Sequence, residues 1–233
     1  MKKLCFILIS FSTYAQNENN INIIDFDVNP AGIIQETSEK RVDSGPKEFF
    51  MNEWSIGTIT LKNGKKIRDV PIRFELIKSN VEIKFQDKIR VCPSRHFTEF
   101  TFLNAKNGNT SKFVNSTLYD DENPLPSSSI MEIIYEDSIS LGALHYIEIK
   151  RATYIPAFDV GKESDEIIQK KTYYMFSKTE VIPLDKKLKK NLIHFSPYQE
   201  EIQDYAESKK LKVLNSEAEI MNLISFYNRL IVK

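Results

Sequence analysis

The chain has 233 residues, and its 32 basic residues balance its 32 acidic ones. This balance lacks the basic excess that is typical of proteins that bind nucleic acid, so we expect no nucleic-acid partner. The length suits one domain with a small appendage, and no stretch approaches the roughly 20 apolar residues of a membrane-spanning helix, so we expect no transmembrane span in the mature chain.

Residues 1–15 carry the pattern of a secretory signal peptide. Lys2 and Lys3 precede an apolar run from Leu4 to Phe11, and small residues follow near Ala15. We therefore predict a mature chain that begins near Gln16 and is exported. Its expected location is the periplasm, the periphery of the outer membrane or the extracellular space.

Only one of the two cysteines belongs to the predicted mature chain. Cys5 lies inside the predicted signal peptide, which leaves Cys92 as the only thiol of the mature chain. No intramolecular disulfide would then form, so the fold depends on the burial of apolar residues. Cys92 ends an alternating apolar pattern, and we expect a half-buried, inert thiol.

Residues 16–45 are rich in Asn, Asp, Glu and Ser and predict a flexible N-terminal arm. An apolar island at 21–28 interrupts the arm and would add one strand to the edge of a sheet.

Residues 46–183 predict an antiparallel β domain, because apolar and polar residues alternate there in short segments separated by turns. The sequence Lys62-Asn63-Gly64-Lys65 is a strong hairpin signal. In the next two strands Arg73, Glu75 and Glu82 alternate with apolar residues, which predicts one buried and one wet face. The expected strands cover 55–61, 72–76, 81–85, 88–91, 97–103, 112–119, 130–136, 144–154 and 171–176.

Residues 184–233 predict helices, since the spacing of apolar residues changes from two to about 3.6. We expect one helix with Ser196 as its N-cap and a last helix that starts with a capping box from Ser216 to Glu219. Such short helices are unstable alone and must dock on the sheet. The predicted fold class is therefore α+β, a bent antiparallel β-sheet, open or partly closed like a barrel or sandwich, packed by C-terminal α-helices.

Three segments carry a resemblance to known proteins. The segments 57–64, 69–74 and 226–230, together with the leader ending Tyr14-Ala15-Gln16, resemble a group of uncharacterised exported proteins of Bacteroidetes-type bacteria. The resemblance implies an envelope or surface location and supplies no activity and no functional residue. In addition, Asp137-Ser138-Ile139 is similar to the O-glycosylation pattern of such bacteria, which implies modification of Ser138.

Residues with catalytic or metal-binding chemistry are few and scattered. The histidines are His96, His145 and His194, and Pro93 disfavours a helical turn that would join Cys92 to His96. We therefore assign no catalytic residue, no cofactor and no metal ligand. The sequence favours a non-catalytic protein over an enzyme. His145 occupies a polar position in a strand of alternating apolar and polar residues, so we expect it on the solvent-exposed face of the sheet.

Two functions remain open. The leading one is a non-catalytic binding or assembly module of the cell envelope, in which the arm adds a strand to the sheet of a protein partner. The alternative is the binding of a small apolar ligand or lipid in a cavity between sheet and helices, lined by Phe74, Phe85, Phe100 and Phe102. In a competing interpretation these rings only fill the core.

Overall fold

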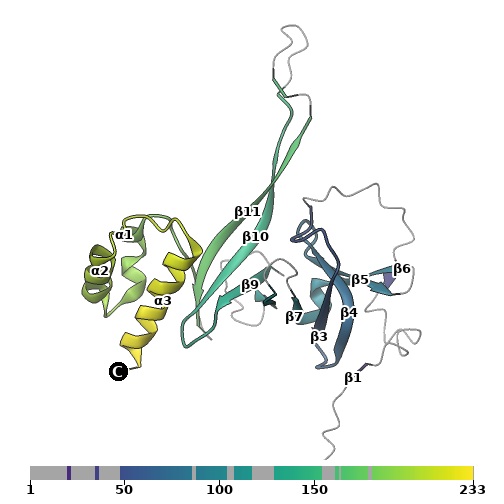
Figure 1. Ribbon diagram of the computed structural model, residues 1–233, viewed down its shortest axis with the longest axis horizontal. Coiled ribbons are helices and arrows are strands. Elements are labelled where there is room, and N and C mark those ends of the chain that lie inside the picture. Colours follow the sequence, from purple (N-terminus) through teal and green to yellow (C-terminus); the bar gives the residue numbers. More distant parts are fainter. Residues whose placement is uncertain are drawn as a thin grey trace, which may run out of the picture.

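The computed structural model describes residues 20–21, 35–36, 48–85, 88–103, 108–116, 129–153, 161–162, 164–177 and 180–232, and the predicted signal peptide lies outside them. Within these ranges the predicted α+β fold is confirmed. Twelve described strands form one sheet that does not close. All of its pairings are antiparallel except that of β1 with β4, and three helices follow at the C-terminal end (Figure 1). In the same ranges, no helix combines the length and the apolar character needed to cross a membrane.

The strands follow one another almost in chain order across the sheet, which runs β12-β11-β10-β9-β8-β7-β3-β4-β5-β6-β2, with β1 beside β4. The elements are β1 (Asn20–Ile21), β2 (Gln35–Glu36), β3 (Ser55–Leu61), β4 (Lys66–Glu75), β5 (Asn80–Phe85), β6 (Lys88–Pro93), β7 (Phe97–Leu103), β8 (Thr110–Asn115), β9 (Ile130–Tyr135), β10 (Ser140–Lys150), β11 (Glu166–Phe176), β12 (Val181–Pro183), α1 (Leu188–Asn191), α2 (Gln199–Ser208) and α3 (Glu217–Ile231).

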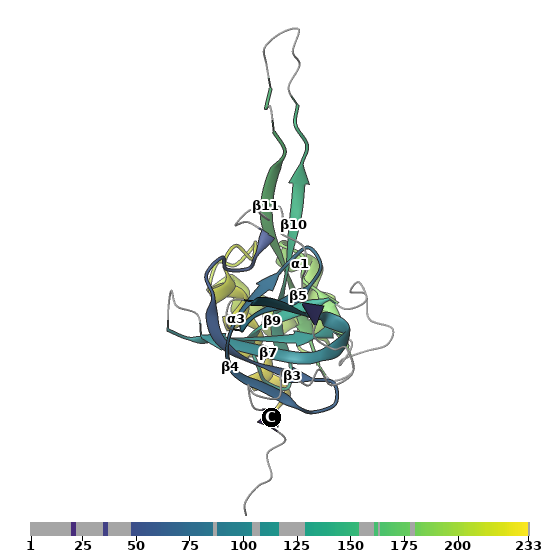
Figure 2. The same cartoon turned by 90° about the vertical axis from the view of Figure 1, so that its right-hand side faces the viewer.

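Strand β4 bends the sheet because it changes partner along its length. Its residues from Lys66 to Ile72 pair with β3, and those from Ile72 to Glu75 pair with β5. The bend wraps β3 to β8 around a first core (Figure 2). This strand core consists of Ile59, Leu61, Ile67, Val70, Ile72, Phe74, Leu76, Val81, Ile83, Cys92, Phe97, Phe100, Phe102, Phe113 and Ile130.

Close packing at the start of the bend depends on Gly57 in β3. A Cβ atom there would lie 2.4 Å from the carbonyl oxygen of Thr101 and 2.5 Å from Cδ1 of Ile72. Both distances are far below van der Waals contact, so only glycine lets β3 lie this close to its neighbours.

The N-terminal arm places two short strands on the chain's own sheet. Asn20 and Ile21 pair in parallel with Lys66 and Ile67 of β4, and β2 pairs with Arg90 and Val91 of β6. Most of the apolar island at 21–28 lies outside the described residues.

Strands β10 and β11 form a long hairpin in which every residue of one strand has a partner in the other, from Ser140 opposite Phe176 to Lys150 opposite Glu166. Both strands begin four or more residues before the predicted positions. At the start of β10, small residues mask the alternation. Gly142 makes room for Met131, since a Cβ atom would lie 2.6 Å from its Sδ. The first half of β11 is polar because it lies on a ribbon that leaves the body (Figure 1).

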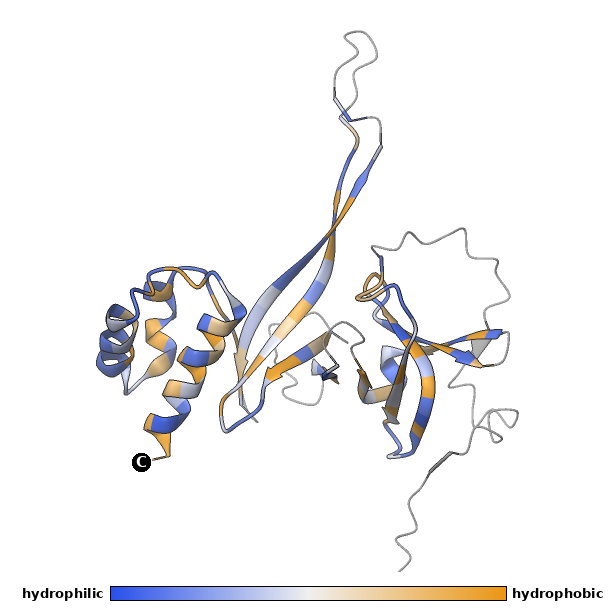
Figure 3. Cartoon of the chain, in the orientation of Figure 1, coloured by the Kyte–Doolittle hydropathy of each residue, from blue (hydrophilic) through white to orange (hydrophobic). Residues whose placement is uncertain are grey.

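The C-terminal helices pack on the end of the sheet through a second core. This helix core consists of Leu141, Met175, Leu188, Phe195, Ile202, Ala206, Leu214, Ile220, Leu223, Ile224 and Tyr227. The buried apolar residues of α3 recur at three- and four-residue spacing, at Ile220, Leu223, Ile224 and Tyr227, which gives the helix one face for this contact. Figure 3 shows apolar and polar segments interleaved along the helix.

Of the two predicted helix N-termini, the structure confirms that of α3 and corrects that of α2. The capping box of α3 is confirmed, because the side chain of Ser216 accepts from the backbone N–H of Glu219 and the Glu219 carboxylate accepts from the backbone N–H of Ser216. The predicted N-cap at Ser196 is wrong, because α2 begins at Gln199 and its N-cap is Tyr198. Ser196 instead ends the preceding 3-10 turn Leu192–Phe195 in extended backbone.

Candidate functional site

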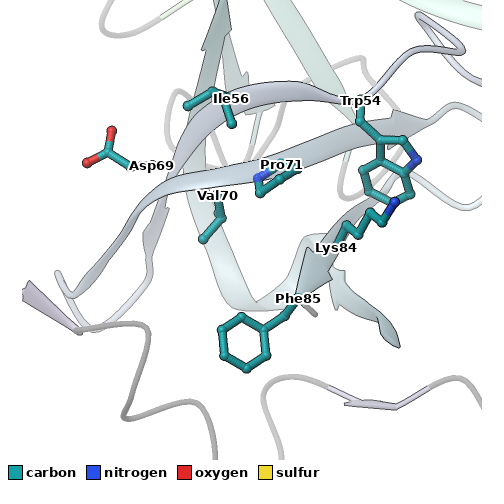
Figure 4. Close-up of a pocket in the computed structure, with 7 residues that line it drawn as sticks. All are labelled: Trp54, Ile56, Asp69, Val70, Pro71, Lys84 and Phe85. Atoms are coloured by element: carbon teal, nitrogen blue, oxygen red, sulfur yellow. The ribbon is translucent and has the colours of Figure 1, made fainter. Parts of the chain in front are cut away.

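A groove lies on β3, β4 and β5, at the point where β4 leaves β5. Its volume is about 510 Å³, within the range of small-molecule and peptide sites. Figure 4 shows the side chains that line it, which are Trp54, Ile56, Asp69, Val70, Pro71, Lys84 and Phe85. Most of this lining is apolar, with one cationic and one anionic residue at the rim.

The groove exists because the strands separate there. Strand β4 pairs with β5 only from Ile72 to Glu75. The residues of β5 beyond this pairing, Lys84 and Phe85, pair with β6 alone. A register shift between Gly57 and Ile59 inserts an extra residue into β4, and Asp69 adopts a φ of 55°. Such a bulge bends its strand and re-aims the neighbouring side chains, here Val70 and Pro71.

The wall of the groove at Trp54 is held by a cation. The guanidinium of Arg73 lies 3.8 Å from the ring centre of Phe49 and 4.6 Å from that of Trp54. Its Nε donates a 2.7 Å hydrogen bond to Oε2 of Glu82, whose side chain is fully buried. Cation–π contacts of this kind strengthen when they are desolvated. Glu82 therefore orients Arg73, which in turn fixes the indole ring of Trp54.

Glu82 and Glu75 correct the predicted wet face of these strands, because both are buried. The segment before β3 covers them. Phe49 forms a β-bridge with Glu75, and the backbone N–H of Phe50 donates to the carbonyl of Phe74. In the observed register Arg73 lies directly opposite Glu82, and opposite charges in such cross-strand positions stabilise pairing, but the sequence pattern did not specify this register.

The four predicted lining residues separate into two groups. Phe74, Phe100 and Phe102 are buried in the strand core and pack around Phe113, with ring centres 4.8 to 5.5 Å from it. Phe85 is only partly buried, packs against the margin of the same core and lines the groove. The structure thus brings three of the rings together in the strand core, away from the helix core. Ligand lining by these four residues stays a prediction.

Ser138 lies in the exposed turn between β9 and β10. Asp137 shapes this turn, since its Oδ1 accepts from the backbone N–H of Ser138 and its Oδ2 accepts from the hydroxyl of Tyr135. The next residue, Ile139, is held by Asn228 of α3 through hydrogen bonds at both its N–H and its carbonyl. Glycosylation of Ser138 stays a prediction, and it concerns a side chain on the surface.

His145 is a second correction to the predicted wet face. Its side chain is 14% exposed and its Nε2 lies 2.7 Å from Oε2 of Glu132. The ring of Phe50 meets the imidazole edge-on, with ring centres 4.6 Å apart. The pair joins β9 and β10 to the segment that precedes β3. Among the described residues, no three His, Cys, Asp or Glu side chains are placed to hold a metal ion.

Cys92 lies in the strand core, more deeply buried than expected, and burial raises the pKa of its thiol to about 12. At neutral pH this leaves roughly a thousandfold less thiolate than at a pKa of 9.0, the thiol's ordinary value. We therefore expect iodoacetamide to alkylate Cys92 far more slowly in the native protein than in urea. Intact-mass measurements over time give both rates, and equal rates would contradict the burial of the thiol.

No family model, curated protein or solved structure matches the chain. The resemblance to exported proteins of Bacteroidetes-type bacteria stays a prediction.

Proposed function

We propose that this chain is an exported, non-catalytic binding protein of the cell envelope and that the groove holds its partner. The observation that carries the proposal is the fixed aromatic wall at Trp54. Arg73 holds the indole and is itself held by the buried carboxylate of Glu82. A large ring that is already ordered loses little entropy on binding, which is why tryptophan is enriched among the residues that dominate binding energies.

The chemistry of the groove favours an extended peptide with apolar side chains. Ile56 is 53% exposed and lies beside Val70, Pro71 and Phe85 in the groove, so these side chains together offer an apolar surface for a partner to cover. Lys84 and Asp69 give the rim one charge of each sign. The backbone of β4 already takes up a short added strand, because β1 pairs with it at Lys66 and Ile67 beside the groove. Addition of an extended segment to a sheet edge is a common mode of peptide recognition.

A second candidate function is the binding of a small apolar ligand or lipid in the same groove. The observation that favours it is the apolar lining of the groove by Val70, Pro71 and Phe85, although the predicted cavity lay between the sheet and the helices. Mass spectra of the native protein distinguish the two candidates, because a bound lipid adds its mass and a groove that takes only peptides does not.

The Trp54→Ala variant tests the peptide proposal. Peptides are first selected from a displayed random library against the wild-type chain, and their Kd values are measured by fluorescence anisotropy. We expect peptides rich in apolar residues, and we expect Trp54→Ala to raise Kd about thirtyfold, the effect of losing a dominant contact.

A second test is Ile56→Ser, and its matched control is Ile193→Ser. Both replace an exposed isoleucine, but Ile193 lies in the 3-10 turn before α2, outside the groove. Ile56→Ser should weaken peptide binding and Ile193→Ser should not. Equal Kd values for the two variants, or a library that yields no binding peptide, would contradict the proposal.

A further inference from the structure

The hairpin of β10 and β11 continues beyond the sheet as a two-stranded ribbon. Strand β9 pairs with β10 only from Leu141 to Leu144, and β12 pairs with β11 only from Tyr174 to Phe176. Beyond these residues the two strands pair only with each other. Ile147 still packs against the strand core and Nε2 of Gln169 donates to the carbonyl of Phe49, while the outer part of the ribbon extends away from the body in both views (Figures 1 and 2). Isolated two-stranded hairpins are marginally stable in water. This ribbon is therefore a candidate for pairing with another chain.

Strand β11 pairs with β10 along one edge. Its other edge, called the outer edge here, pairs with β12 only from Tyr174 to Phe176. No strand among the described residues lies against this edge at Ile167, Ile168 or Lys171. The backbone N–H of Leu184 donates to the carbonyl of Tyr173, which shows that the odd-numbered residues of β11 direct their backbone groups toward this edge. Sheet edges of this kind are templates for a further strand.

The sequence along this edge is symmetric in charge about Ile168. Two acidic residues precede the centre and two basic residues follow it, in the order Asp165-Glu166-Ile167-Ile168-Gln169-Lys170-Lys171. An antiparallel copy of the same segment, centred on the same isoleucine, would place acids opposite bases throughout. Glu166 would face Lys170 of the second copy, and Asp165 would face Lys171. Opposite charges in such cross-strand positions stabilise pairing.

The register also satisfies the backbone. A two-fold axis at Ile168 pairs odd-numbered residues with odd-numbered ones, so groups directed toward the edge meet groups directed toward the edge, as an antiparallel ladder requires. The symmetric segment stops at Lys171, two residues before Tyr173, whose carbonyl is taken by Leu184. The chain's own β12 therefore does not overlap the seven residues that would pair.

The four charged side chains are accessible to a second chain. Their exposed fractions lie between 35% and 43%. Each already has a partner within the chain, since Asp165 pairs with Arg151, Glu166 with Lys162, Lys170 with Glu148, and Lys171 with Glu217. Surface ion pairs of this kind contribute little, so exchanging or sharing them with a second chain has a small cost.

We propose that two copies of this chain pair antiparallel through the outer edges of their β11 strands, about a two-fold axis at Ile168. The interface is isologous, as in most closed dimers. It uses a different surface from the peptide groove, so the two proposals fail or hold independently.

Charge reversal tests the pairing. Sedimentation velocity of the wild-type mature chain should show dimers in the micromolar range. Glu166→Lys and Lys170→Glu should each raise the dimer Kd about tenfold or more, because each turns two attractive cross-strand pairs into repulsive ones. A mixture of the two variants should dimerise again, since the lysines of one copy then face the glutamates of the other. The control Lys189→Glu, on the exposed face of α1, should leave the Kd unchanged.

A crosslink gives an independent readout. In the proposed register the two Ile168 residues face each other as a non-hydrogen-bonded pair, with Cβ atoms about 5 Å apart. Ile168→Cys should therefore form a disulfide-linked dimer on mild oxidation, and Ile149→Cys, on the neighbouring strand, should not. A wild-type chain that stays monomeric at micromolar concentrations, a mixture that stays monomeric, or equal crosslinking of the two cysteine variants would overturn the proposal.

Discussion

Replacing Asn228 by alanine is expected to lower the free energy of unfolding by about 2–4 kcal/mol. Asn228 is 2% exposed in α3, and its side chain is bonded to the backbone of Ile139 twice. Oδ1 accepts from the N–H of Ile139 at 2.8 Å, and Nδ2 donates to its carbonyl at 2.7 Å. Alanine would leave both backbone groups without these partners at a largely buried site, which costs more than the hydrogen bonds themselves contribute. Urea unfolding followed by circular dichroism measures the change.

Asn222 provides the control in the same helix. It is exposed, so Asn222→Ala makes the same chemical change without touching the sheet and should alter stability by less than about 0.5 kcal/mol. Asn228→Asp keeps the acceptor for the N–H of Ile139 and removes the donor to its carbonyl, so it should also lower the free energy of unfolding by more than Asn222→Ala does. Equal unfolding midpoints for Asn228→Ala and Asn222→Ala would show that the link between α3 and the turn at Ile139 is not energetically important.

The sequence was sufficient where local signals and burial agree. Strands β3 and β7 have the predicted bounds. The turn between β3 and β4 also follows its sequence, since Gly64 has a φ of 81° and the side chain of Asn63 accepts from the N–H of Lys65. In these segments a strand has one buried face, and the alternation of residues records it directly.

Local patterns failed where distant segments decide burial. Glu82 and His145 occupy polar positions in alternating strands, and residues before β3 contribute to shielding both. The ring of Phe49 lies against Arg73, the partner of Glu82, and the ring of Phe50 packs against His145. No local signal indicates that a segment outside the strands will cover this face. The start of β10 was missed for a related reason, because Gly142 is selected by the size of Met131 on the adjacent strand rather than by strand propensity.

The candidate site was only partly accessible to sequence reasoning. Phe85 was predicted to line a cavity between sheet and helices and lies instead in the groove on β3, β4 and β5. Trp54, the chain's only tryptophan, was not among the predicted lining residues. The groove depends on the bulge at Asp69 and on the separation of β4 from β5. Both are properties of strand pairing, which one sequence does not specify. The motif 226–230 was interpreted as a helical end, and the structure adds the role of Asn228 in joining that end to the sheet.

Replacing Glu82 by alanine is expected to lower the free energy of unfolding by about 2–4 kcal/mol. The change removes the fully buried partner of Arg73, whose own side chain is 18% exposed, and leaves the guanidinium between two aromatic rings without this carboxylate. The partial exposure of Arg73 places the expected loss below that of a completely buried pair. Because Trp54 is the only tryptophan, its fluorescence should also shift as the indole loses its fixed contact.

Two variants separate the ion pair from general effects of losing a carboxylate. Glu136→Ala breaks the exposed pair with Lys112 and should cost less than about 1 kcal/mol. Glu82→Leu combined with Arg73→Met replaces both charges by apolar groups of similar size, and it should regain most of the stability lost in Glu82→Ala. If Arg73 acts on the groove through Trp54, this double variant will be stable and yet bind the selected peptides more weakly. Stability restored together with unchanged peptide binding would therefore separate the fold from the site and remove Arg73 from the binding mechanism.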